Sequence, residues 1–153
     1  MTKRSITHGT FTVERVFPNC TPARAFDAFA NPESKAKWFG GPADWNKGPS
    51  GMDFRVGGRE HASGGPKGGP QSRFDALYYD IIPNERIVYT YEMYHDDNRI
   101  SVSLATITFE AQGSSTKLVM HEDGAFLDGC DGAEGRERGT RGLMEQLASS
   151  LAK

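Results

Sequence analysis

The chain has 153 residues, a length that fits one domain with a substantial core, and we expect a single domain over 1–153. With 37% hydrophobic and 25% charged residues, it is too apolar for a disordered tail and too polar for a membrane protein. Its net charge of −2 argues against a nucleic-acid partner, because phosphate contacts need clustered Lys and Arg.

The chain shows no sign of a membrane or secretory segment. No apolar run approaches the roughly 20 residues of a membrane span, and no apolar segment follows the charged N-terminus. Cys20 and Cys130 lie outside any CxxC pattern, which is typical of free thiols in a reducing compartment. We therefore expect a cytoplasmic protein with no membrane partner.

The N-terminal part predicts one strand and two short helices. Alternating apolar residues indicate a half-buried strand over 10–17. Thr21 is a candidate helix N-cap with Pro22 at the first helical position. A second short helix is expected to begin after Asn31 and run toward Trp38 and Phe39, before a glycine pair ends it.

A glycine-rich region follows. We expect a strand over 52–56, a tight turn at the next two glycines, and a mobile hairpin loop over 63–70. That loop lacks the Lys-Ser/Thr ending and the following helix of a phosphate-binding loop. It is a candidate gate for a binding site rather than a phosphate cradle.

The middle of the chain predicts an antiparallel meander. Strands are expected over 74–82, 86–94, 100–110 and 116–122, separated by turn-forming residues. In the second of these, one parity is apolar and largely aromatic, so we expect that side to face inward; its members are Ile87, Tyr89, Tyr91 and Met93.

The C-terminal segment 131–152 predicts a long amphipathic helix. Leu143, Leu147 and Leu151 recur at four-residue spacing. Extending that stripe backward places Arg136 on the apolar side of the helix. Glycines recur at helical spacing in the first half of the helix, each costing about 1 kcal/mol relative to alanine, which suggests close packing or open space beside it.

Four stretches carry a family resemblance over nearly the whole chain. They read FPNCTPARAFDAFANPESKAKWFG at 17–40, DFRVGGRE at 53–60, DIIPNERIVYTYEM at 80–93 and HEDGAFLDGCDGAEGRERGTRGLMEQL at 121–147. Together they resemble the activators of the heat-shock-protein ATPase and their bacterial homologues, an AHSA-like family of the START-like and polyketide-cyclase-like superfamily. The resemblance implies an α+β helix-grip fold, in which a curved antiparallel sheet wraps around a long C-terminal helix.

The same resemblance implies a cavity between sheet and helix, and no metal, cofactor or fixed catalytic set. Aromatic walls suit flat or acyl ligands. We expect a small apolar or amphipathic ligand there, with polar contacts from Arg136 and Glu122. The full set of candidate ligand-binding residues is Trp38, Phe39, Tyr89, Tyr91, Met120, Glu122, Phe126, Arg136 and Leu143.

Arg136 has two competing interpretations. It is costly to bury without a partner, so one interpretation is a structural salt bridge with Glu122, Asp128 or Glu60. The other is an anchor for a ligand carboxylate or enolate.

Two kinds of chemistry are alternatives to simple binding. His121 and Asp123 share one strand face and Glu122 the other, which is too few ligands for a metal site. General acid–base pairs are conceivable between Tyr89 or Tyr91 and an acid or histidine, namely Asp80, Glu122 or His61. No Ser-His-Asp or Cys-His motif is visible, so we favour a binding protein over an enzyme and assign no catalytic residue.

Three alternatives stay open. The family implies a stimulator of a chaperone ATPase, and the superfamily includes cyclase-like and hydrolase-like enzymes that act on small aromatic or acyl substrates. The predicted strand 74–82 is apolar on both faces, so one face is a candidate surface for a homodimer.

Overall fold

The computed structural model describes residues 3–153, which form one curved antiparallel sheet with three helices on one side. The strands are β1 (Ile6–Phe17), β2 (Asn46–Lys47), β3 (Gly51–Met52), β4 (Arg59–Gly65), β5 (Ser72–Ile82), β6 (Arg86–His95), β7 (Asn98–Gln112) and β8 (Ser115–Leu127). The helices are α1 (Pro22–Ala30), α2 (Pro32–Lys35) and α3 (Ala133–Leu151). This arrangement confirms the predicted α+β helix-grip fold.

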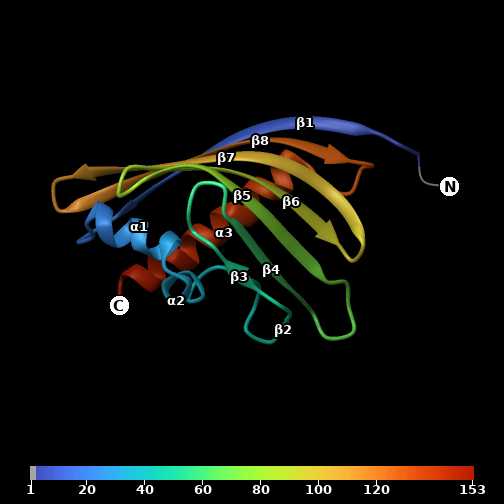
Figure 1. Cartoon of the computed structure of the whole chain (residues 1–153), viewed down its shortest axis with the longest axis horizontal. Coiled ribbons are helices and arrows are strands. Elements are labelled where there is room, and N and C mark those ends of the chain that lie inside the picture. The colour runs from blue at the N-terminus through green and yellow to red at the C-terminus, as the bar shows by residue number, and fades with distance from the viewer. Residues whose placement is uncertain (1–2) are drawn as a thin grey trace.

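The order of strands is β1-β8-β7-β6-β5-β4-β2, with β3 paired to β4. Sequence neighbours from β4 to β8 are hydrogen-bonded hairpins, as the meander predicted, and β1 returns to pair with β8. Figure 1 shows α3 crossing one face of the sheet, with α1 and α2 beside its C-terminal end. We call the side that faces α3 the inner face.

The predicted helix starts are confirmed. The Thr21 hydroxyl accepts a hydrogen bond from the Arg24 amide at 3.2 Å, and Pro22 opens α1. The second helix, α2, ends at Lys35 and is therefore shorter than expected. Trp38 therefore lies beyond the helix, where its indole donates to the Ala28 carbonyl at 2.9 Å.

Two predictions in the glycine-rich region are wrong. Of the expected strand 52–56 only Met52 pairs with β4, together with Gly51 before it, since the residues that follow turn back on themselves. The expected loop 63–70 begins too early, because 63–65 belong to β4 and pair with β5 or β2. The Ser63 hydroxyl also bonds to the Pro49 carbonyl at 3.0 Å, which fixes this end of β4.

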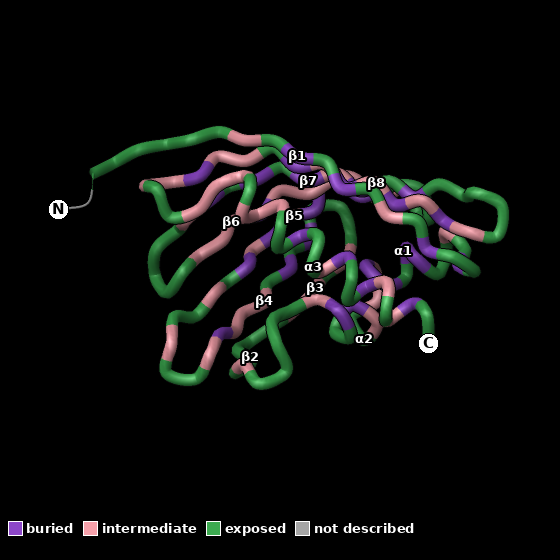
Figure 2. Tube along the Cα trace, turned by 180° about the vertical axis from the view of Figure 1, so that it is seen from behind, coloured by how far each residue is buried: buried purple, intermediate pink, exposed green. Residues whose placement is uncertain are grey.

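The core lies between the inner face and the helices. Buried positions alternate with exposed ones along the long strands (Figure 2). Phe11 and Val13 of β1 face Met144 and Leu147 of α3 in one buried cluster, which confirms the apolar side of that helix. At the start of α3 the approach is so close that a Cβ on Gly9 would lie 2.3 Å from the Ala133 Cβ.

No helix among residues 3–153 combines the length and apolar character that a membrane span requires.

Candidate functional site

A polar cluster lies on the inner face where β6, β7, β8 and α3 meet. Tyr91 of β6 pairs across the sheet with Ser103 of β7, and Ser103 pairs with Gly124 of β8. Alternation along the strands puts Glu122 on the same face, where only 4% of its surface is exposed. Arg136 approaches from the first half of α3.

The cluster is a continuous chain of hydrogen bonds. The Tyr91 hydroxyl donates to Glu122 Oε1 at 2.5 Å and accepts from Arg136 Nη1 at 3.0 Å. Arg136 Nη2 donates to Ser101 Oγ and to Asp131 Oδ2, both at 2.8 Å. The guanidinium is thus held from three sides.

The predicted salt-bridge partners of Arg136 are wrong. Its ion pair is with Asp131, and its side chain is only 12% exposed. Glu122 reaches it through Tyr91, while Asp128 pairs with Arg4 and Glu60 with Lys35. The predicted helix 131–152 includes Asp131, but α3 begins at Ala133, so Asp131 does not follow the helical projection that placed Arg136.

Burial sets the protonation of this cluster. It raises the pKa of Glu122, against the lowering effect of the Tyr91 hydrogen bond and of the Arg136 charge. It also raises the pKa of Tyr91, and the nearby Glu122 carboxylate raises it further. Tyr91 therefore stays a neutral phenol that donates a hydrogen bond, which does not suit a general base.

Ser103 lies beside the polar cluster, but its side chain takes no part in the hydrogen bonds. It is 3% exposed, and its Oγ is the buried side-chain polar atom within 3–153 that finds no hydrogen-bond partner. Gly124 packs closely beside it, because a Cβ there would lie 3.1 Å from this oxygen and 3.0 Å from the Phe126 ring. An unpaired buried hydroxyl typically costs about 1–3 kcal/mol, so this one needs an explanation.

An aromatic wall continues from the polar cluster across the inner face. The Tyr91 ring lies 5.0 Å from Phe74 and 5.9 Å from Tyr89, and Phe74 lies 5.1 Å from Phe39. Tyr89 and Phe39 are half-buried, so the wall is partly accessible. Trp38 lies behind it, packed edge-on against Phe29 at 4.8 Å.

The remaining predicted site residues surround the same region. Phe126 is buried, with its ring centre 5.3 Å from the Arg136 guanidinium carbon. Met120 is buried in the main core, and Leu143 is half-buried on α3. Of the acid–base pairs considered, the structure brings together only Tyr91 and Glu122; Asp80 bonds to Arg86, and His61 is exposed on β4.

A second buried polar group lies at the far end of the aromatic wall. Lys35 Nζ donates to Glu60 Oε1 at 2.7 Å, and the Tyr78 hydroxyl donates to the same oxygen. The Lys35 ammonium also lies 4.4 Å from the centre of the Phe39 ring. Burial lowers the pKa of Lys35, opposed by the Glu60 charge.

We call the side of α3 that carries Gly139 its open side, because Gly139 is exposed there. Arg141 and Glu145 line a hollow with Val13 and Arg15, so that side of the helix faces β1. At about 100° per residue, Gly139 lies roughly 160° around the axis from Arg141 and so faces away from β1. A Cβ on Gly139 would have no heavy atom within 4 Å.

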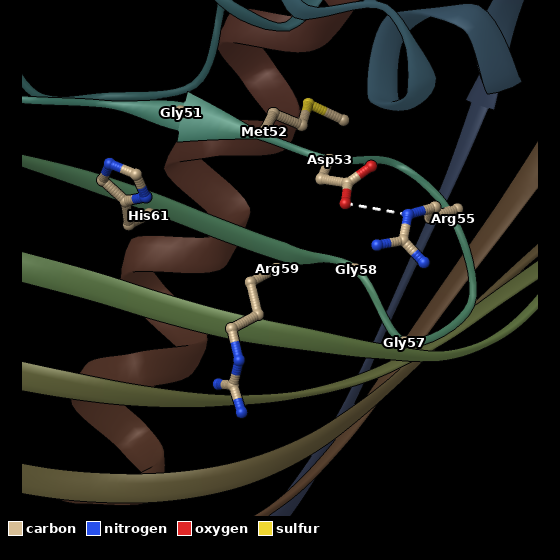
Figure 3. A pocket seen from close by; sticks show the side chains of 8 residues that line it. All are labelled: Gly51, Met52, Asp53, Arg55, Gly57, Gly58, Arg59 and His61. Atoms are coloured by element: carbon tan, nitrogen blue, oxygen red, sulfur yellow. Dashed lines mark hydrogen bonds and ion pairs between the residues drawn. The ribbon is translucent and has the colours of Figure 1, made fainter.

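A second hollow lies elsewhere on the surface. It has a volume of about 430 Å³ and is bounded by β3, the following turn and β4. Figure 3 shows its polar rim, with Arg59 and His61 on β4 and the Asp53–Arg55 pair on the turn. None of the predicted ligand-binding residues lines either hollow.

Within 3–153, no group of three or more His, Cys, Asp or Glu side chains is placed to hold a metal ion. His121 instead contacts the hydroxyls of Thr10 and Thr12, at 3.3 and 2.8 Å, on the outer face of the sheet.

Comparison with known proteins places this fold in a family. A family model described as Activator of Hsp90 ATPase homolog 1-like protein matches residues 19–153. The chain belongs to this family. The match confirms the resemblance found in the sequence.

Several solved structures share the fold of this chain. A protein from Rhizobium leguminosarum is 40% identical with a TM-score of 0.91, and the match covers 99% of both chains. Mll3558 from Rhizobium loti is 43% identical with a TM-score of 0.88, over 96% of this chain and 99% of that one. An AHSA1-like protein from Aeromonas hydrophila shares the fold at 15% identity and a TM-score of 0.69, over 94% and 92% of the two chains. A search of the curated proteins found no match.

Proposed function

We propose that this protein binds a small amphipathic molecule between the inner face of the sheet and the open side of α3. The observation that carries the proposal is Ser103, whose buried hydroxyl lacks a partner although it lies beside the hydrogen-bonded network of Tyr91 and Arg136. A bound molecule would supply that partner.

The surroundings of Ser103 support this role. Neighbouring aromatic rings offer apolar contact area, and Tyr91, Glu122 and Arg136 form a rigid polar end. The open side of α3 at Gly139 offers a route to this face. In this arrangement the apolar part of the ligand lies along Tyr89 and Phe39, and its polar part lies at Ser103.

Native mass spectrometry of gently purified protein, compared with the denatured mass, tests the proposal. We expect a retained small molecule in the wild type and its loss in Gly139→Leu, which puts a side chain into the open space. Arg141→Leu is the control, since residue 141 lies roughly 160° around the helix axis from Gly139 and so points away from this side. A bare native mass in the wild type, or equal retention in both variants, would overturn the proposal.

The same spectrum reports whether the chain forms the homodimer that the apolar strand β5 predicts. Tyr79 of that strand is 56% exposed at a β-bulge, which supports a surface for a second copy.

A second candidate function is stimulation of an Hsp90-type ATPase. The family match supports it, together with Val102 and Leu104, which are exposed apolar side chains at alternate positions on the outer face of β7. The test is the ATPase rate of the purified chaperone with and without this protein. A rise that Leu104→Lys abolishes supports this function, and an unchanged rate rejects it.

A further inference from the structure

We propose that the ligand presents an uncharged oxygen group, a hydroxyl or a carbonyl, to Ser103, and that the site rejects carboxylates. This inference rests on the proposed function, because it specifies the chemistry of the same site. It revises the interpretation of Arg136 as an anchor for an anion.

The charge balance of the cluster carries the argument. Asp131 and Glu122 are two carboxylates, and Arg136 is the one guanidinium hydrogen-bonded within their network. Arg136 already has an ion-pair partner at 2.8 Å, so its charge is largely compensated. A ligand carboxylate would lose its hydration and meet no free cation while lying near Glu122.

The hydrogen-bonding groups left over fit an uncharged oxygen. Ser103 Oγ has both its donor and its acceptor capacity unused. Among the described residues, no hydrogen bond reaches Glu122 Oε2, since Tyr91 donates to Oε1. A ligand hydroxyl can accept from Ser103 and donate to Glu122, and a ligand carbonyl can accept from Ser103.

Arg136 then acts as a positioning residue. Its two terminal nitrogens donate to Tyr91, Ser101 and Asp131, which fixes the phenol that in turn holds Glu122. The Phe126 ring lies 5.3 Å from its guanidinium carbon. These contacts fix the polar end of the site before any ligand arrives.

The test uses three probes that share one ring system: 2-naphthylmethanol, 2-naphthoate and 2-naphthylmethylammonium. Titration calorimetry of the full chain at about pH 7.5 gives the three affinities. We expect the alcohol to bind at least tenfold more tightly than the carboxylate. Equal or tighter binding of the carboxylate overturns the charge argument, and tightest binding of the ammonium ion shows that Glu122 selects cations instead.

Two variants locate the effect. Ser103→Ala is expected to lower the affinity for 2-naphthylmethanol roughly three- to tenfold, because it removes one hydrogen bond. Ser115→Ala, on the outer face of β8, is the control and should leave this affinity unchanged. Asp131→Asn removes the partner charge of Arg136, so it is expected to raise the affinity for 2-naphthoate relative to the alcohol by about tenfold. An unchanged ratio in Asp131→Asn contradicts the assignment of Arg136.

Failure of this inference is distinguishable from failure of the proposed function. If none of the three probes binds the wild type, the proposed site itself is rejected. If the probes bind but the order of their affinities differs from the expected one, the proposed site is supported and its ligand belongs to a different chemical class.

Discussion

The buried pair of Lys35 and Glu60 predicts a large and asymmetric effect on stability. The two residues are 9% and 5% exposed, and Nζ lies 2.7 Å from Oε1. At an effective dielectric constant of about 20, two charges at that separation attract by about 6 kcal/mol, which offsets their loss of hydration. Removing one charge leaves the other buried without compensation.

Glu60→Gln is therefore expected to lower the free energy of unfolding by about 3–5 kcal/mol. In a chain of this size that lowers Tm by roughly 6–20 °C. The double variant Lys35→Met with Glu60→Gln should recover most of the loss, because it removes both charges and keeps an acceptor for the Tyr78 hydroxyl. Urea unfolding followed by circular dichroism measures all three proteins.

The exposed pair of Arg73 and Asp75 is the matched control. Its side chains are 45% and 32% exposed, so Asp75→Asn should cost less than about 1 kcal/mol. The reasoning is refuted if Glu60→Gln costs no more than this control, or if the double variant is no more stable than the single one.

Three further changes have expected outcomes. Burial raises the pKa of Glu122 above its usual 4.5, so this carboxyl keeps its proton to a higher pH in the native state than in the unfolded state. As the pH rises between the two pKa values, the unfolded state loses the proton first, and the free energy of unfolding therefore falls. Glu122→Gln should therefore gain stability relative to wild type as the pH rises above 4.5 in urea unfolding, and parallel curves of stability against pH would contradict this. Gly9→Ala should cost about 1–3 kcal/mol through its contact with Ala133, and Ala133→Gly in the same chain should restore part of it; no recovery in thermal melts would refute the contact. Trp38→Phe leaves the Ala28 carbonyl without its donor, so a loss of about 1–3 kcal/mol is expected, and a neutral result would show that another donor replaces the indole.

The fold was predictable because the sequence patterns that specify its strands, helices and turns are local. Alternation along 86–94 placed Tyr89 and Tyr91 on the inner face, and four-residue spacing in α3 placed Arg136 on the buried side; both are confirmed. Turn chemistry predicted the hairpins around 96–97 and 113–114, where Asp96 and Gly113 have positive φ.

The details of the site were not predictable from the same signals. Lys35 and Glu60 come from different segments, and nothing in either segment indicates that the two side chains meet. Asp131 lies before the first residue of α3, whereas the predicted helix 131–152 included it, so its contact with Arg136 did not follow from helical spacing. Ser103 was missed, although the small residues at alternate positions 101, 103 and 105 of β7 already suggested room above that strand.

The central claim is that a small amphipathic molecule binds beside Ser103 on the inner face. Its most direct test is a titration of ¹⁵N-labelled protein with 2-naphthylmethanol, an uncharged amphipathic probe with a hydroxyl group, followed by amide chemical shifts. We predict saturable shifts concentrated at Ser103, Gly124 and Gly139. Saturable shifts confined to other surfaces, or none up to the solubility limit of the probe, would contradict the account.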